Sequence, residues 1–137
     1  MNVAGYSTKS VIQKLGVKPG FRIFVDGAPA EYRDIVGALP DGARIVARPK
    51  APLDMVHLFA TQAKGLASKL SRYRDVIAPD GMIWVSWPKK ASGMATDLGD
   101  VVVRDIALPL GLVDIKVSAI DEVWSGLKFV IPVAKRR

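Results

Sequence analysis

Apolar and polar residues alternate along the chain in segments whose period distinguishes strands from helices. Short apolar runs bounded by Gly, Pro or Asp predict strands, and apolar residues spaced three or four apart predict helices. Strand 54–60 (DMVHLFA) is almost continuously apolar, which indicates that both of its faces are covered. The six expected strands cover residues 21–26, 43–47, 54–60, 82–87, 112–120 and 127–133.

Four helical segments are expected between these strands. Ser7 is the expected N-cap of the first, and residues 30–39 form the second. Thr61 and Thr96 are the expected N-caps of the third and fourth. The apolar residues that define the last two helices are Leu66, Leu70, Tyr73 and Ile77 in the third, and Leu98, Val101, Val102 and Ile106 in the fourth.

Strands that alternate with helices predict an α/β fold with a mostly parallel sheet and helices on both of its faces. The last two strands are too close in sequence for a helical crossover, so the final strand is expected to be antiparallel. The expected turn between them is Trp124-Ser125-Gly126. We therefore expect a three-layer fold of about six strands in one domain, residues 1–137.

The composition narrows the possible chemistry. The chain has no Cys and one His, which excludes disulfides and thiolate catalysis and makes a transition-metal site improbable. Its formal net charge of +7 favours an anionic small molecule, an acidic protein or nucleic acid as the partner. We expect no cofactor.

The start of the chain and its hydropathy predict where the protein resides. Residues 1–10 contain no apolar core of a signal peptide, and no apolar run approaches the roughly 20 residues of a membrane helix. A cytoplasmic protein without membrane contact is the expectation.

Three stretches resemble the class I S-adenosylmethionine-dependent methyltransferases, a Rossmann-like fold. They resemble, in order, the entry into the first strand, a central helix-to-strand passage and the closing strand pair. The stretches are KLGVKPGFRIFVDG, RDVIAPDGMIWVSWPKK and GLVDIKVSAIDEVWSGLKFVIPVAKR. The resemblance implies an architecture, and one fold hosts many functions.

Shorter segments resemble a bacterial family of short proteins of unknown function. These segments are YSTKSVIQKLGVKPG, WPKKASGMATDL and DEVWSGLKF. The resemblance implies the same fold and assigns no reaction.

Two features of an active methyltransferase are missing. The resemblance implies a Gly-rich loop after the first strand, where the backbone approaches the methyl donor, but the chain has Gly27-Ala28-Pro29 there. It also implies an acid after the second strand to bind the ribose, where Arg48 stands instead and has no acceptor. The chain is therefore predicted not to bind S-adenosylmethionine.

The segment after strand 82–87 is the best candidate ligand site. It leaves the carboxyl end of a central strand, where open α/β sheets bind ligands. Its lysines supply positive charge, and N–H groups of a helix starting at Thr96 are expected to bind an anion. An ordinary solvated loop is the alternative. The candidate residues of this segment are Trp87, Lys89, Lys90, Ser92, Gly93, Thr96 and Asp97.

Trp124 is the candidate aromatic wall of the same site, with a packed tryptophan that pins the hairpin as the alternative. Trp84 and Trp87 are three residues apart in one strand and must point to opposite faces. Trp84 is expected in the core.

Other residues that carry chemistry are better explained by structure. His57 lies in the middle of an apolar strand, where a packed neutral imidazole is expected. Asp26, Asp97, Asp121 and Glu122 lie near strand ends or a helix start, and no spacing links them as an acid–base pair.

These observations favour a non-catalytic binding or regulatory module with an anion or small-ligand site at the carboxyl rim of the sheet. A diverged methyltransferase-like transferase is the first alternative, and a nucleic-acid binder is the second. A dimer through an exposed edge strand is possible.

Overall fold

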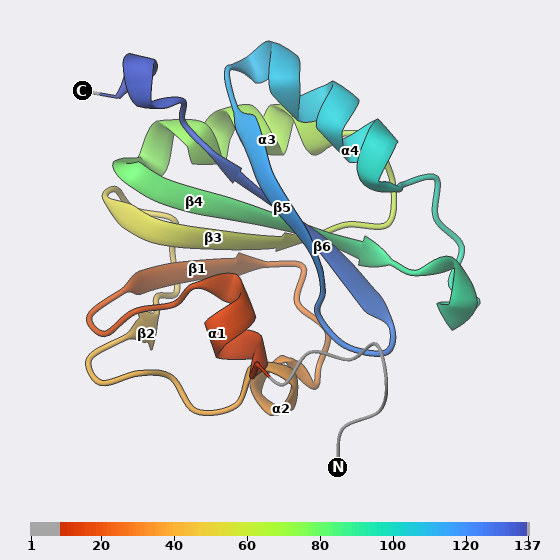
Figure 1. Ribbon diagram of the computed structural model, residues 1–137, viewed down its shortest axis with the longest axis horizontal. Helices are drawn as coiled ribbons and strands as arrows, with labels where there is room; N and C mark the ends of the chain where they lie inside the picture. The colour runs from red at the N-terminus through yellow and green to blue at the C-terminus, as the bar shows by residue number, and fades with distance from the viewer. Residues whose placement is uncertain (1–8, 137) are drawn as a thin grey trace.

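A six-stranded sheet runs through the computed structural model, which describes residues 9–136 (Figure 1). The strand order is β2-β1-β3-β4-β6-β5. Neighbours among β1 to β4 pair in parallel, and β6 is antiparallel to both β4 and β5. The predicted fold class is therefore confirmed. The strands are β1 (Arg22–Asp26), β2 (Arg44–Ile45), β3 (Leu53–Phe59), β4 (Ile77–Pro88), β5 (Val113–Ala119) and β6 (Trp124–Val130).

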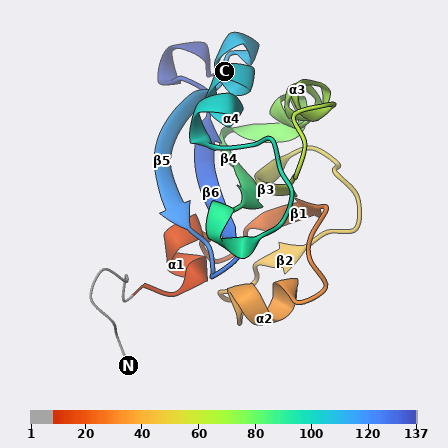
Figure 2. The same ribbon diagram turned by 90° about the vertical axis from the view of Figure 1, so that its right-hand side faces the viewer.

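Helices cover both faces of the sheet, which gives three layers (Figures 1 and 2). α1 (Val11–Leu15) and α2 (Tyr32–Val36) lie on one face, and α3 (Leu66–Val76) and α4 (Asp100–Ala107) lie on the other. Three short 3₁₀ turns complete the described structure, η1 (Lys90–Ser92), η2 (Leu108–Leu110) and η3 (Val133–Lys135). No helix in residues 9–136 is long and apolar enough to cross a membrane.

The apolar pattern of the central strands produces two core layers. Val56 and Leu58 of β3 pack under α3 and α4, whereas Met55 and Phe59 pack under α1 and α2. β3 therefore buries side chains on both faces, as its continuous apolar run predicts. Trp84 and Trp87 of β4 likewise enter opposite layers, and the Trp84 indole donates to the carbonyl of Leu15 over 2.9 Å.

The N-terminal ends of the helices differ from the sequence-based expectation. α1 is capped by Ser10, whose hydroxyl accepts from the Gln13 N–H, while the predicted cap Ser7 lies outside the described residues. α3 begins after Gly65, whose positive φ of 80° lets the chain turn into the helix, so Thr61 is not its cap. α4 begins after Gly99, so Thr96 is not a cap either.

The closing hairpin also turns earlier than predicted. Trp124-Ser125-Gly126 belongs to β6, and residues 120–123 make the turn. The reason is Asp121, whose carboxylate accepts the backbone N–H groups of Val123 and Trp124 over 2.9 and 2.7 Å. A carboxylate that bonds the backbone two and three residues ahead is an effective turn former.

The connection from β2 to β3 contains no helix. β2 has only two residues, and β3 lies on the other side of β1. Residues 46–52 make this crossover as a loop. The remaining connections between parallel strands pass through α2, α3 and α4, as the alternation of strands and helices predicts.

Candidate functional site

The carboxyl end of β4 meets the turn of the closing hairpin. The Lys89 N–H donates to the Val123 carbonyl over 2.7 Å, and Pro88 pairs with Trp124. The hairpin turn therefore lies at the same rim as Lys89. Two segments far apart in sequence therefore form one part of the rim.

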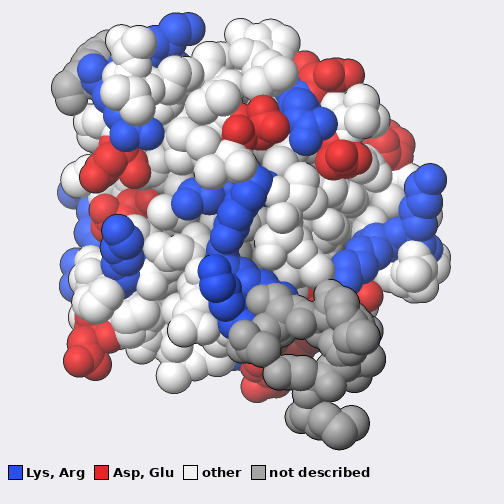
Figure 3. All heavy atoms as spheres, in the orientation of Figure 1, with Lys and Arg blue, Asp and Glu red and all other residues white. Residues whose placement is uncertain are grey.

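A cavity of about 620 Å³ opens at this part of the rim. Lysines come to it from three elements, because Lys14 lies on α1, Lys89 follows β4 and Lys116 lies on β5. Lys9 and residues 117–122 complete the lining. Figure 3 shows a group of Lys and Arg side chains near the centre of the face on which these elements meet.

Basic residues outnumber acidic ones in the lining of this cavity. Lys14 donates to the Ala119 carbonyl over 3.2 Å, which holds α1 against the end of β5. Of the two acids, Asp121 is engaged by the backbone of its own turn, and Glu122 is exposed. Four lysines against two carboxylates give the cavity a net positive potential, which attracts anions.

The predicted loop site is only partly brought together. Of the predicted residues, Lys89 lines the cavity; the others lie outside its lining. Lys90, Gly93 and Asp97 are exposed, while Ser92 is half-buried and donates to the Lys89 carbonyl over 2.7 Å.

The other polar groups of this loop fasten it to the segment after β3. The Thr96 hydroxyl donates to the Thr61 carbonyl over 2.7 Å, and Asp97 accepts from the Ala63 N–H over 2.8 Å. α4 starts four residues after Thr96, with the carboxylate of Asp100 in its first turn. The predicted helix-start N–H groups at Thr96 are therefore absent, which corrects that part of the anion-site prediction.

The two candidate tryptophans are buried. Trp87 is 6% exposed and Trp124 is 7% exposed. Trp124 packs edge-on against Phe59, with ring centroids 5.0 Å apart. Trp87 belongs to the core layer under α3 and α4, and Trp124 belongs to the layer under α1 and α2. Neither ring lines the cavity, so Trp124 serves to hold the hairpin against the body of the protein.

The carboxylate of Asp26, at the end of β1, already has partners within the protein. Asp26 accepts a short hydrogen bond from the Tyr73 hydroxyl and lies 3.5 Å from the Lys69 amine. Burial and the Asp26 carboxylate raise the pKa of Tyr73. Gly27 follows with a φ of 72°, and a Cβ there would lie 2.7 Å from the Phe59 carbonyl oxygen. The turn therefore packs tightly on β3.

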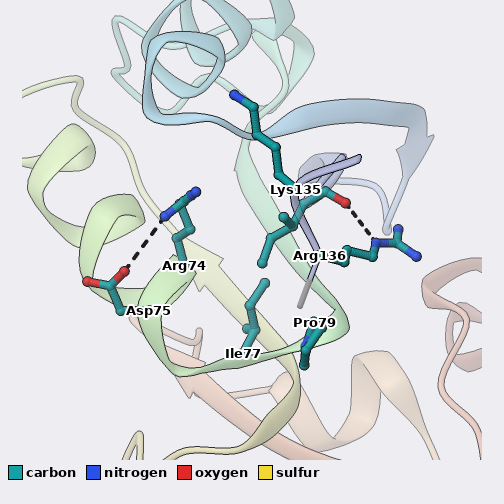
Figure 4. Close-up of a pocket in the computed structure, with 7 residues that line it drawn as sticks. Arg74, Asp75, Ile77, Pro79, Lys135 and Arg136 are labelled. Carbon is teal, nitrogen blue, oxygen red and sulfur yellow. Dashed lines mark hydrogen bonds and ion pairs between the residues drawn. The ribbon is translucent and has the colours of Figure 1, made fainter. Parts of the chain in front are cut away.

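A second, smaller cavity of about 260 Å³ lies at the opposite end of the strands, beside the start of β4 and the segment after β6 (Figure 4). Arg74 pairs with Asp75 over 3.8 Å, and Arg136 donates to the Ile131 carbonyl over 2.9 Å. Figure 4 shows the guanidinium group of Arg136 pointing away from that of Arg74. The positive charges of this cavity do not converge, so it is the weaker candidate.

Sequence reasoning missed a buried polar network around His57. The imidazole is fully buried, with Nδ1 3.0 Å from the Tyr32 hydroxyl and Nε2 2.8 Å from the Ser86 hydroxyl. Burial lowers the pKa of His57 to about 3, so the ring is neutral in the folded protein. The prediction of a buried, neutral histidine is confirmed, and its partners come from α2 and β4.

Solved structures of methyltransferases have a similar fold. A TehB-like SAM-dependent methyltransferase from Corynebacterium glutamicum is 13% identical, with a TM-score of 0.59 over 93% of this chain and 90% of that one. The chain has a methyltransferase-like fold. A SAM-dependent methyltransferase from Aquifex aeolicus is 14% identical, with a TM-score of 0.61 over 88% of each chain.

Magnesium protoporphyrin IX methyltransferase from Synechocystis, solved with bound SAH, has a TM-score of 0.54 at 13% identity. It aligns with 88% of this chain and 78% of its own. No protein-family model and no curated protein sequence matches the chain. The similarity to methyltransferases is therefore one of fold, and the resemblance to a bacterial family of unknown function stays a prediction.

Proposed function

We propose that this methyltransferase-like domain is a binding module that holds an anionic small molecule in the lysine-lined cavity and does not transfer methyl groups. The observation that carries the proposal is the convergence of Lys14, Lys89 and Lys116 on one cavity at the carboxyl rim. Ligands of open α/β sheets bind at this rim, and about 620 Å³ lies within the usual range for a small-molecule site.

The chemistry of the lining favours phosphate or carboxylate groups. Each lysine presents an ammonium group that donates up to three hydrogen bonds and accepts none. Ser118 also lines the cavity, and its hydroxyl donates to the Ala119 carbonyl over 3.4 Å, so the lysines supply the main donors for a ligand. A ligand with several anionic oxygens fits better than a neutral or cationic one.

The region after β1 supports the absence of methyl transfer. Asp26 is already held by Tyr73 and Lys69, and Pro29 leaves the turn one N–H short. The Pro29 carbonyl accepts a hydrogen bond from the Tyr32 N–H over 3.0 Å. This turn has few free donors for a cofactor.

Isothermal titration calorimetry with pyrophosphate at low ionic strength tests the proposal. Binding is expected to weaken with added salt, because screened charge supplies part of it. Lys89→Gln is expected to weaken binding, and Lys64→Gln, an exposed lysine before α3, is the matched control. Equal affinity in both variants, or no binding by the unaltered protein, would reject the cavity as the site.

A diverged transferase is the second candidate function. It is supported by the methyltransferase-like fold and by Asp26-Gly27 at the end of β1, where a carboxylate and a tight turn meet. Measurable affinity for S-adenosylmethionine would favour this candidate over the binding module.

Nucleic-acid binding has less support. Arg44 lies on β2, and Lys89 follows β4, three positions away in the sheet. Ile45 is level with Met82 in the register of the sheet, whereas Lys89 comes seven residues after Met82, past the carboxyl end of β4. Arg44 and Lys89 therefore lie toward opposite ends of the strands and do not form one continuous track along the rim.

A further inference from the structure

β5 forms an exposed edge of the sheet. It is the last strand in the order, and β6 separates it from the rest (Figures 1 and 2). An edge strand presents unpaired N–H and C=O groups on its outer side. The register of β5 shifts between Asp114 and Lys116, and its regular part, residues 116–119, is still longer than β2, the two-residue strand at the other edge.

The two faces of β5 differ in chemistry. Lys116 lies on the side of α1, where its amine is 5.9 Å from the centre of the buried Trp84 ring. Val117 points to the opposite face, because it pairs with Leu127 of the core layer under α3 and α4. Val117 is 50% exposed, and its neighbour Ile115 is 53% exposed.

Lys116 is part of a cluster of lysines with Lys18 and Lys128. It pairs directly across the sheet with Lys128 of β6. Burial lowers the pKa of Lys128, and the nearby charges of Lys116 and Lys18 lower it further. None of the ion pairs found in residues 9–136 involves Lys18, Lys116 or Lys128.

This arrangement is unfavourable in the isolated protein. Like charges directly opposite each other destabilise a pair of strands. Departures from otherwise consistent local rules are expected at functional sites. Here the missing component is negative charge along the α1 side of β5.

We infer that β5 is a docking edge for an extended acidic polypeptide that adds a strand to the sheet. Successive side chains of a strand point to opposite faces, so an acidic residue of the added strand would lie beside Lys116 on the α1 side. Lys128 lies on the same rung, one strand further in, and adds its positive charge to that position. Apolar residues next to this acidic residue in the added strand would cover Val117 on the opposite face. The partner backbone would pair with the outer N–H and C=O groups of β5.

Other occupants fit this edge less well. A second copy would bring its own Lys116 and a further net charge of +7 to the same surface. Nucleic acid would leave the strand edge and the apolar side chains uncovered, and Trp84, Trp87 and Trp124 are all buried and offer no stacking surface.

The inference goes beyond the proposed function, with which it shares Lys116. Lys128 and Lys18 lie outside the lining of the cavity, whereas Lys89 and Lys14 belong to it. Substitutions of Lys128 therefore test the edge, and substitutions of Lys89 test the cavity.

The probe is a short, end-blocked peptide of alternating Glu and Val, measured by fluorescence anisotropy and by amide hydrogen exchange. We expect binding that protects amides of β5 from exchange. The double variant Lys116→Gln/Lys128→Gln is expected to bind about threefold more weakly, because it removes the cross-strand partner Lys116 and the neighbouring charge of Lys128. Lys64→Gln is the control, and Lys89→Gln is expected to retain peptide binding.

A peptide with N-methylated amides at alternate positions removes the donors that would pair with β5. Retained binding of this peptide overturns strand addition. Binding of single-stranded RNA but not of the Glu-Val peptide overturns the acidic-polypeptide assignment. A dimer by light scattering that is disrupted by Val117→Lys overturns it in favour of a second copy.

Discussion

At the residue scale, His57 is the clearest example of a polar group that serves the core. Both ring nitrogens have hydroxyl partners, Tyr32 from α2 and Ser86 from β4. Buried polar groups are tolerated when they are hydrogen-bonded, and such networks hold a core in one arrangement. The ring also stacks on Phe59, with centroids 4.3 Å apart. His57 therefore links one helix to two strands and does not reach the rim.

Stability is expected to fall with acid through His57. Its pKa is lowered from 6.5 to about 3 by burial, so between these values the unfolded state binds the proton and the folded state does not. Stability therefore rises with pH across this window and is lost as the pH falls, by up to about 1.4 kcal/mol per pH unit. Urea unfolding at several pH values should show a smaller slope in His57→Gln. Equal slopes in the two proteins would contradict a neutral buried ring.

Gly27 is predicted to be irreplaceable in the turn after β1. Ala at Gly27 must adopt a positive φ, which costs about 1–2 kcal/mol, and its Cβ would also meet the Phe59 carbonyl oxygen at 2.7 Å. Gly93→Ala is the matched control, because Gly93 has a φ of 78° with no atom within 4 Å of that Cβ. Gly27→Ala should lower the free energy of unfolding by at least about 1 kcal/mol more than the control. Similar losses of unfolding free energy in the two variants would show that the backbone around Phe59 moves away from the added Cβ at little cost.

The sequence predicts which single residues are buried better than it predicts their partners. The apolar neighbours of His57 in strand 54–60 indicate burial, but Tyr32 and Ser86 lie 25 and 29 residues away. The same limit applies to Asp26 and Tyr73, which are 47 residues apart. Such pairs depend on how elements pack, and no local pattern encodes them.

At the element scale, lengths and connections explain what was predictable. The short link between the last two strands predicts the antiparallel pair, and it forms. The prediction of two threonine caps was wrong. The Thr96 hydroxyl donates to the Thr61 carbonyl instead, and Gly65 and Gly99 are the residues that precede the two helices. The lysine cavity was only partly predictable. Lys89 follows a strand, but Lys14 and Lys116 reach the rim through the packing of α1 and the register of β5.

The lysine pair of β5 and β6 gives a prediction at this scale. Replacing Lys116 by Gln removes a positive charge beside Lys128, so the pKa of the Lys128 amine should rise toward its ordinary value. NMR titration of the lysine side chains measures this directly, with Lys64→Gln as the control. An unchanged Lys128 pKa in Lys116→Gln would show that the two amines do not interact.

At the scale of the whole molecule, the chain combines a methyltransferase-like fold with a group of lysines at the carboxyl rim beyond β4 and β5, away from the end of β1. The fold was predictable because strand and helix patterns alternate along most of the chain. The function follows from the site, because one fold hosts many activities. The end of β1 is occupied by its own side-chain contacts, while the lysines meet beyond β4 and β5.

S-adenosylmethionine and S-adenosylhomocysteine are predicted to bind more weakly than a dissociation constant of about 0.1 mM. The reasons are the Pro29 turn, which lacks an N–H donor, and the exposed Arg48 after β2, which has no acceptor for ribose hydroxyls. Isothermal titration calorimetry measures this affinity. A dissociation constant below that limit would contradict the prediction and favour methyl transfer.

The most direct test of the account is an amide NMR titration of the protein with pyrophosphate. If the lysine-lined cavity is the anion site, shift changes should concentrate at Lys89 and residues 116–122 and should be strongly reduced in the double variant Lys14→Gln/Lys89→Gln. Changes centred on residues 26–30 instead, or changes that persist unaltered in the double variant, would contradict it.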